Sequence, residues 1–290
     1  MGRIDKTKKF SKKKLLVGIL VATMMMGTVS MANEYPQSNL DNALASYLGI
    51  DKNNQSLNGA SAYIDKSVTN NNLKLNVKQT LGDKHSIYIL IEVETPKNIT
   101  IPEYASFNEM DINLKKPYSA GWGITHVEDK NVNDNKQSYI ISYSTEGKLN
   151  GNDITLDFKD FGYYSDKDGE FIELVKGNWN ISWKLDYTDV SKEIIVNRFV
   201  KTKNNKYFVR KVNISPISVS ANLIGKNNGD FMIEEVTLKD GTSYNATDFI
   251  SSGGSSSFLK AFTNVEFGKV VDANQIEIIT IDGRGIKIKN

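Results

Sequence analysis

The spacing of apolar residues is the feature that most limits what this chain can fold into. From Ser67 to the C-terminus, apolar side chains recur at every second position in short runs, as in 73–77, 87–93 and 179–185. A period of two puts alternate side chains on opposite faces of a β-strand, so that one face can enter a core. Polar turn clusters separate the runs and no helical period lies between them, which predicts an all-β fold rather than a parallel βαβ sheet.

The strand pattern falls into two sets that meet near Val190. Short strands at this spacing are typical of immunoglobulin-like (Ig-like) sandwiches, and each set has the length of one such domain. We therefore expect two tandem Ig-like β-sandwich domains, 63–190 and 191–290, after an N-terminal hydrophobic helix and one short amphipathic helix. The low-complexity run SSGGSSS at 251–257 is expected to be a mobile loop. The expected strands lie within 73–77, 87–93, 121–128, 137–145, 153–161, 179–187, 192–200, 206–215, 217–225, 232–246 (a hairpin), 257–267, 275–283 and 284–290.

The N-terminus has the three parts of an export signal. Residues 1–14 carry seven bases and one acid, residues 15–32 carry no charge, and the small residues Ser30 and Ala32 precede Asn33. We expect a signal peptide over 1–32, cleaved between Ala32 and Asn33. An uncleaved signal anchor is the alternative, because an uncharged run of 18 residues is long enough to span a bilayer as a helix. In both cases the body is extracytoplasmic, either secreted or attached to the cell membrane by the N-terminal helix.

The net charge changes sign once this leader is set apart. The whole chain holds 36 Lys and Arg against 34 Asp and Glu, a net charge of +2. Removing 1–32 takes away seven bases and one acid, which leaves 29 bases against 33 acids and a net charge of −4. A mildly acidic body without a basic run argues against a nucleic-acid partner, because binding phosphates needs a surplus of Lys and Arg on one face.

The segment 33–62 contains one short helical period. After Pro36, apolar residues follow at i, i+3, i+4, i+7 and i+8, namely Leu40, Ala43, Leu44, Tyr47 and Leu48. Gly49 is placed to end the helix as a C-cap, and a polar linker follows it. We expect the apolar stripe to dock on the first domain, with the membrane surface as the alternative site.

The residue inventory leaves little for catalysis. The chain has no Cys, which excludes disulfides, thiolate metal sites and cysteine nucleophiles. Its two histidines, His85 and His126, lack the spacing of a metal-binding pair. The acidic loop 164–169 lacks the closing Glu of a calcium loop, so it is expected to be a hairpin turn. We expect no catalytic residue, no metal site and no cofactor, and interpret the protein as a non-enzyme.

Aromatic residues support an alternative function. Exposed rings stack on the apolar faces of sugars, so a group of them would suit a secreted module that binds cell-wall polysaccharide, or an adhesin. Core packing of the tyrosines is the competing interpretation. The possible ligand platform comprises Trp122, Tyr118, Tyr163 and Tyr164. A third hypothesis, a cryptic hydrolase, would need a carboxylate pair such as Asp157 and Asp160 across a cleft.

Two segments of the body resemble a known family. In 65–95 a Lys-Val-Thr-Asn pattern precedes a hydrophobic alternation, an Asp and a second hydrophobic strand, and 267–288 resembles a closing strand pair. With the basic head, the apolar span and the short helix, they resemble the extracytoplasmic region of Gram-positive anti-sigma-factor-like membrane proteins. In that family a domain of unknown function is followed by a second Ig-like domain. The counterparts here are Lys66, Val68, Thr69, Asn71, Asp83, Ile87 to Ile91, Phe267, Val271, Asp272, Ile276, Ile281 and Gly283, with Asn72 where Gly is common.

The resemblance implies a sensor-like binding body without catalytic residues. Family members that act as anti-sigma factors have a helical sigma-binding segment of several dozen residues before the span. Only 14 residues precede it here, which is too few to fold around a sigma factor. We therefore expect an envelope-associated accessory of a regulatory membrane system. Its expected partner is an envelope protein or a cell-wall polymer, together with the membrane if the N-terminal helix stays uncleaved.

Overall fold

The computed structural model describes residues 40–50, 55–115, 120–128, 134–202, 206–225, 231–257 and 259–288. The chain divides into a unit Met1–Glu34 and a compact unit Tyr35–Asn290. The predicted leader and its cleavage site at Ala32 and Asn33 therefore lie outside the described residues. Within the ranges given above, no helix is long and apolar enough to cross a membrane.

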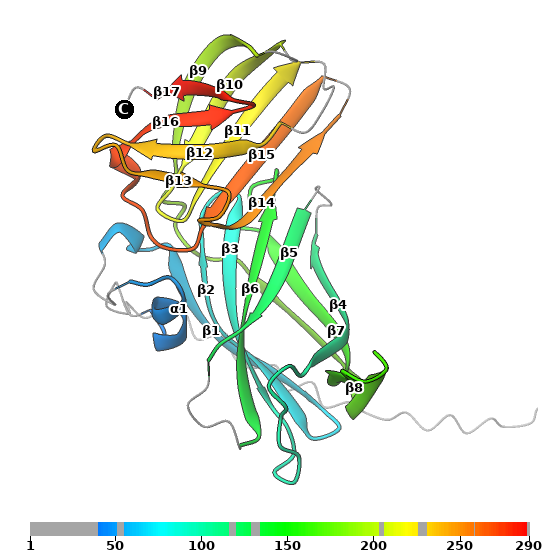
Figure 1. The fold of residues 1–290 in the computed structure, drawn as a ribbon. Coiled ribbons are helices and arrows are strands. Elements are labelled where there is room, and N and C mark those ends of the chain that lie inside the picture. The colour runs from blue at the N-terminus through cyan, green and yellow to red at the C-terminus, as the bar shows by residue number, and fades with distance from the viewer. Residues whose placement is uncertain are drawn as a thin grey trace, which may run out of the picture. The chain divides into compact units, whose positions relative to one another are not determined.

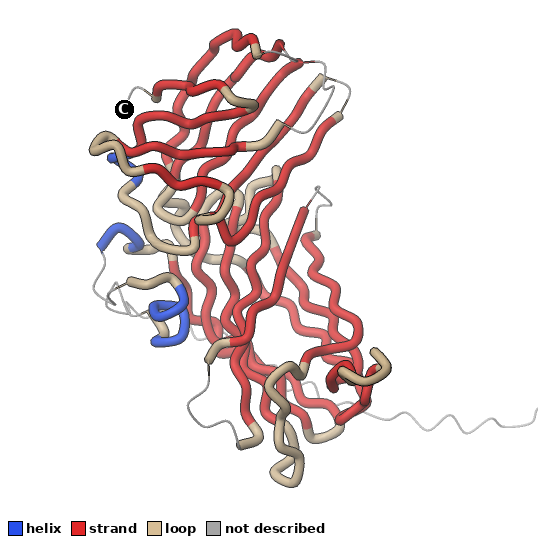
Figure 2. The backbone as a smooth tube through the Cα atoms, viewed as in Figure 1, coloured by secondary structure: helices blue, strands red, loops and turns tan. Residues whose placement is uncertain are grey.

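The described chain is mostly β, as predicted, and its strands form four antiparallel sheets (Figures 1 and 2). The strands are β1 (Ser61–Asn70), β2 (Leu73–Gly82), β3 (Ser86–Glu94), β4 (Ser106–Leu114), β5 (Ala120–His126), β6 (Lys136–Thr145), β7 (Asp153–Tyr164), β8 (Phe171–Lys184), β9 (Lys192–Lys201), β10 (Lys206–Ile214), β11 (Ser218–Gly225), β12 (Ile233–Leu238), β13 (Ser243–Asn245), β14 (Phe249–Ser256), β15 (Lys260–Phe267), β16 (Ile276–Ile281) and β17 (Arg284–Lys287).

Strands β1 to β8 make a first pair of sheets around one core. Their orders are β1-β2-β3-β6-β5 and β4-β7-β8. The predicted hairpin of β2 and β3 is present, and Trp179, Ile181 and Trp183 of β8 point into the core as their spacing predicts. A two-residue turn joins β1 to β2, and both of its residues, Asn71 and Asn72, have positive φ. Asn tolerates that conformation better than other non-glycine residues. Asn72 occupies the position at which Gly is common in the family that the sequence resembles.

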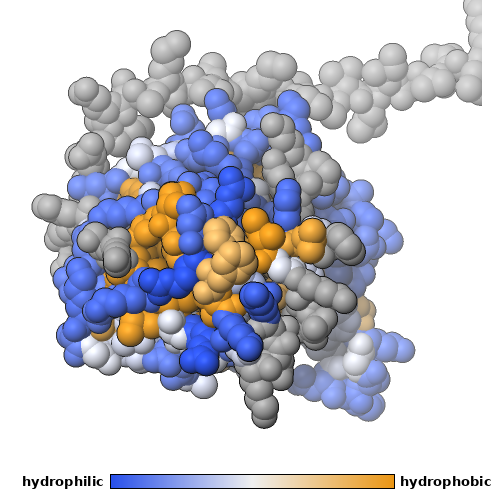
Figure 3. Space-filling view, turned by 90° about the horizontal axis from the view of Figure 1, so that it is seen from above, coloured by the Kyte–Doolittle hydropathy of each residue, from blue (hydrophilic) through white to orange (hydrophobic). Residues whose placement is uncertain are grey.

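Strands β9 to β17 make a second pair of sheets around a separate core. Their orders are β14-β15-β11-β10-β9 and β13-β12-β16-β17. The predicted hairpin through Asp240-Gly241 joins β12 to β13, with Gly241 at φ +88°. Seen from above, the surface carries apolar side chains among hydrophilic ones (Figure 3).

The amphipathic helix is present as α1 (Asn42–Tyr47), with two short 3-10 turns, Gln55–Leu57 and Ala273–Gln275, elsewhere. The carboxylate of Asp41 caps its first turn by accepting from the Ala43 N–H at 2.9 Å. Leu44 and Leu48 are completely buried against the outer face of the first sheet pair. Docking on protein, which the stripe predicted, is therefore confirmed.

One expectation was wrong. The run SSGGSSS is not a mobile loop, because Ser251 to Ser256 belong to β14, an edge strand that pairs with β15. Gly and Ser have low strand propensity, so the ladder to β15 stabilises the strand where its side chains do not. Gly254 also fits where a larger residue would not, since a Cβ there would lie 2.8 Å from the Phe262 carbonyl oxygen. Strands β1 and β4 were also not fully predicted from the alternation of apolar residues.

Candidate functional site

The outer face of one sheet is polar and yet buried. Toward the β10–β11 turn, the side chains of β10, β11 and β15 that point away from the second core are Ser, Asn and Glu, and Ser215 of that turn lies beside them. We call this the polar face; it comprises Asn213, Ser215, Ser218, Ser220, Asn264 and Glu266, each at most 4% exposed. The first sheet pair covers it, mainly through the turn between β2 and β3.

Hydrogen bonds to backbone groups hold the turn 82–86 in one conformation. The Asp83 N–H donates to the Ser86 carbonyl at 2.9 Å, and the Tyr187 hydroxyl donates to the Asp83 carbonyl at 2.7 Å. Gly82 is required here, since a Cβ would lie 2.7 Å from the Tyr187 ring. The turn therefore presents the side chains of 83–86 to the polar face in one conformation.

The Asp83 carboxylate joins the two sheet pairs. Its Oδ1 accepts from the N–H groups of His85 and Ser86, both at 2.8 Å, which closes the turn. Its Oδ2 accepts from the hydroxyls of Ser215 and Ser218 on the other side of the interface, the latter at 2.6 Å. Four donors around one carboxylate that is 1% exposed make this a strong, charge-assisted contact.

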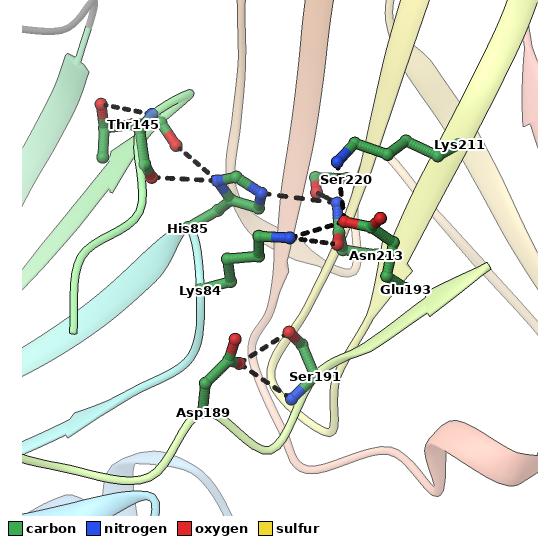
Figure 4. A network of polar contacts seen from close by, with 10 residues as sticks. Lys84, His85, Thr145, Asp189, Ser191, Glu193, Lys211, Asn213 and Ser220 are labelled. Carbon is green, nitrogen blue, oxygen red and sulfur yellow. Dashed lines mark hydrogen bonds and ion pairs between the residues drawn. The ribbon is translucent and has the colours of Figure 1, made fainter. Parts of the chain in front are cut away.

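His85 continues the contact on the other side of the turn (Figure 4). Its Nδ1 lies 3.2 Å and 3.1 Å from the carbonyl oxygens of Thr145 and Gly147, so the ring proton is assigned to Nδ1. The Nε2 atom then accepts from the Asn213 amide at 3.4 Å. Burial lowers the pKa of His85, although the Asp83 charge and the two carbonyls oppose that shift. The ring is therefore neutral in the closed interface.

An ion triad lies at the edge of the interface, also in Figure 4. The ammonium groups of Lys84 and Lys211 both bind Glu193 Oε2 at 2.7 Å, and Lys84 donates to Asn213 Oδ1 at 3.2 Å. Hydrogen bonds from Lys211 and then Lys84 lower the pKa of Glu193 to about 2. Because Lys84 belongs to the first sheet pair and the other members to the second, the triad joins the two across a partly solvated rim.

Glu266 is the exception in this network. It is fully buried, and within the described part of the chain neither carboxylate oxygen has a hydrogen-bond partner of normal geometry. Burial, followed by the charge of Asp83, raises the pKa of Glu266 to about 8, while the hydroxyls of Ser86 and Ser144 act in the opposite direction. At neutral pH the side chain is therefore mainly a neutral carboxylic acid.

Helix α1 packs beside the same interface. Leu44 and Leu48 share a hydrophobic cluster with Tyr88 of β3 and with Ile217, which precedes β11. The Tyr47 ring meets Tyr88 edge to face, with centroids 6.0 Å apart, and the Tyr88 hydroxyl donates to the Phe267 carbonyl at 3.3 Å. Helix α1 is thus packed against both sheet pairs where they meet.

The two carboxylates at this interface are closed to solvent. Asp83 and Glu266 are a carboxylate pair, but both are closed to solvent, and the oxygens of Asp83 are already occupied by internal donors. A hydrolase would need such a pair in an open cleft. Within the described ranges, no group of three or more His, Asp or Glu is placed to hold a metal ion.

The described members of the predicted aromatic platform lie in two different sheets. Trp122 lies on β5, which pairs with β6 at one edge of its sheet, and its side chain is 42% exposed. Tyr163 and Tyr164 are the last two residues of β7, which belongs to the other sheet. The C-terminal end of β4 pairs with the start of β7. Tyr118 lies outside the described residues.

The tyrosines have local partners instead. Tyr163 is half-buried against the first core. Tyr164 donates to Asn108 Oδ1 at 3.1 Å and meets Phe171 edge to face. The acidic loop 164–169 forms the predicted hairpin turn between β7 and β8.

The other polar candidates are also accounted for locally. Asp160 has φ +45° and accepts from the Gly177 N–H at 3.0 Å, while Asp157 pairs with Asn180 across β7 and β8. His126 lies on β5 against the Tyr139 ring, with centroids 4.8 Å apart, and burial lowers its pKa. None of these residues shares a site with another sequence-predicted candidate.

Sequence reasoning missed the polar face. The alternation of Val219, Ala221 and Leu223 with Ser218 and Ser220 indicates the inward face, but it does not show what covers the other face. The signal lay in residue type, since short uncharged Ser and Asn occupy places where a solvated strand usually carries Lys, Glu or Thr. Of the network, Asp83 was part of the family pattern, and His85 was considered only as one of two histidines without the spacing of a metal pair.

The comparisons with known proteins bear on the fold. The sequence matches no protein-family model and no curated protein. Among solved structures, it is similar to the crystal structure of a conserved domain protein from Bacillus anthracis. The TM-score is 0.58 at 13% sequence identity, over 86% of this chain and 81% of that chain. At this identity the likeness shows a shared β-rich, multi-sheet fold.

Proposed function

We propose that this protein is a non-enzymatic, extracytoplasmic binding module of the sensor-like type, an envelope-associated accessory of an anti-sigma-like membrane system. The N-terminal leader and the resemblance of 65–95 and 267–288 support the location and the system. The two sheet pairs, each around its own core, support two tandem Ig-like domains, 63–190 and 191–290. Its partner is an envelope protein or a cell-wall polymer, and its chemistry needs no cofactor.

The observation that carries this proposal is the polar interface between the sheet pairs. Asp83, His85 and the polar face contact each other through hydrogen bonds, which water can replace when the interface opens. Opening an apolar interface would instead expose hydrophobic surface to water, which costs more free energy. A ligand that binds better to one arrangement of the two bodies would shift the population toward it. Such an interface is suited to reporting on binding.

The position of α1 would couple a change at the interface to the N-terminal segment of the chain. The helix lies between the leader and β1 in sequence, and its apolar stripe packs on Tyr88 and Ile217 at the junction. Opening the interface would remove Ile217 from this cluster and expose part of the Leu44 and Leu48 surface. A change at the interface is therefore coupled to the segment next to the leader.

The location is tested by proteolytic shaving of intact Gram-positive cells that express the full chain. We expect the body to be digested from outside, and mass spectrometry of medium and membrane fractions to recover a species that begins at Asn33 or retains the leader. Recovery of the undigested full chain in the cytosol would overturn the proposal.

The interface is tested by measuring distances between spin labels. Because the chain has no Cys, Glu128→Cys and Lys239→Cys place one label on each sheet pair at exposed positions. Asp83→Ala removes the acceptor of two hydroxyls across the interface, so we expect a second, longer distance while the circular dichroism of the sheets is retained. Asp168→Ala, which removes a turn-capping carboxylate remote from the polar face, is the matched control. An unchanged distance, or joint unfolding of both pairs, would refute a separable interface.

The alternative, a secreted wall-polysaccharide-binding or adhesin module, has one specific observation in its favour. Trp122 is 42% exposed on β5, at the edge of its sheet. This version predicts that Trp122→Ala abolishes pull-down on purified cell-wall fragments and that Tyr164→Ala does not. Equal binding by both variants and the wild type would remove it.

A further inference from the structure

The outer face of the β9 sheet changes character toward the end remote from the polar face. There a row of side chains crosses four adjacent strands, and the register aligns Phe199 with Phe208, Phe208 with Ile224, and Ile224 with Lys260. Their neighbours Val200, Tyr207 and Leu223 point into the second core, so the row points away from it. We call these four residues the Phe199 row.

Three of the row's four residues are apolar, namely Phe199, Phe208 and Ile224. Phe199 is 71% exposed and Ile224 is 40% exposed, and nearby Ile195 and Leu259 are also exposed. The Phe199 and Phe208 rings pack on each other on this outer face, with centroids 4.9 Å apart. Apolar side chains gathered in this way mark an interaction surface more often than single exposed ones do.

Basic residues surround the row. Strands β9 and β10 carry six Lys and Arg against one acid, Glu193, which is already bound by Lys84 and Lys211. Lys201 and Lys206 lie opposite each other beside the row, with the Lys206 ammonium 5.8 Å from the Phe199 ring. Within the described chain, Lys201, Lys206 and Lys260 form no ion pair, whereas Asp282 and Glu234 of the other sheet bind Thr202 and the Gly283 N–H. The local charge is therefore opposite to the −4 of the body.

We propose that the Phe199 row and its flanking lysines form a docking surface for an anionic lipid bilayer. The choice of a membrane rests on the proposed extracytoplasmic function, whereas the surface chemistry stands by itself. Phospholipid headgroups would pair with the lysines, and the apolar rings would enter the boundary between headgroups and acyl chains. A hydrophilic polyanion would use the lysines alone and would leave the phenylalanines in water, so the apolar row favours lipid.

The test is flotation of the compact unit 35–290, which omits the apolar leader, with vesicles. Vesicles of phosphatidylcholine are compared with vesicles that also contain phosphatidylglycerol. We expect binding to the anionic vesicles only, weakened at least tenfold by Phe199→Ser with Phe208→Ser, and abolished by Lys201→Glu with Lys206→Glu. High salt should weaken it as well, because charge attraction is screened.

Matched controls make the result specific. Tyr104 is 73% exposed on the first sheet pair, so Tyr104→Ser removes a comparable ring. The exposed Lys115 and Lys176 supply the control charge reversal. Lack of binding to anionic vesicles, or equal binding by the Phe199/Phe208 variant and the wild type, would overturn the proposal. Binding to soluble polyphosphate that is insensitive to the phenylalanines would assign the surface to a polyanion instead. Vesicle binding is measured in vitro with purified protein. A negative result would therefore contradict the docking surface without contradicting the extracytoplasmic location, which proteolytic shaving tests separately.

Discussion

Replacing Glu266 by Gln should make the protein more stable, and more so as the pH rises. In the folded state the pKa of Glu266 is raised from 4.5 to about 8 by burial, and in the unfolded chain the carboxyl returns to its ordinary value. Between these values the unfolded state ionises and the folded state does not. The stability contributed by the protonated acid is thus fully present below about pH 4.5 and is lost progressively until about pH 8, by roughly 1.4 kcal/mol per pH unit.

Gln has nearly the same shape but no ionisation, so the difference between Glu266→Gln and the wild type isolates this effect. We expect a difference in unfolding free energy below about 1 kcal/mol near pH 5, which grows to about 4 kcal/mol near pH 7.5. Urea denaturation at several pH values measures it, and Glu128→Gln, at an exposed glutamate, is the control that should show no trend. A difference that stays constant with pH would refute the assignment of a neutral buried acid.

Three further predictions concern the same region. His85→Gln should remove a loss of stability on acidification, because the lowered pKa of His85 means that its stability is present above about pH 6.5 and is lost as the pH falls; the variant and the wild type are compared by thermal unfolding. Gly82→Ala should cost about 1–3 kcal/mol in urea denaturation, because its Cβ would meet the Tyr187 ring at 2.7 Å. Leu44→Ala should cost about 2–5 kcal/mol if α1 is an integral part of the fold, and an unchanged midpoint would show that it is not.

The sequence allowed the all-β class, most strands and the docking of α1 to be predicted, because these follow from local periodicity. The alternation of Val219, Ala221 and Leu223 identified a core face in the same way that Trp179 and Trp183 did. Edge strand β14 could not be predicted, since Gly and Ser carry no strand signal and the partner β15 decides the conformation. Nor could the burial of the outer face of β11, because period two reveals which residues share a face but not what covers it.

The residues on that hidden face indicate why the two sheet pairs join as they do. Apolar side chains of similar size would bury the same area at lower electrostatic cost, since a buried polar group gains little net stability even when it is paired. Asp83 still needs four donors in one arrangement, and Glu266 remains neutral only while it is closed off from water. Such an interface specifies one register strongly but contributes modestly to stability, which is why we expect it to open without the two cores unfolding. An interface with those two properties, packed against α1, is what the proposed binding-dependent change between the two sheet pairs would require.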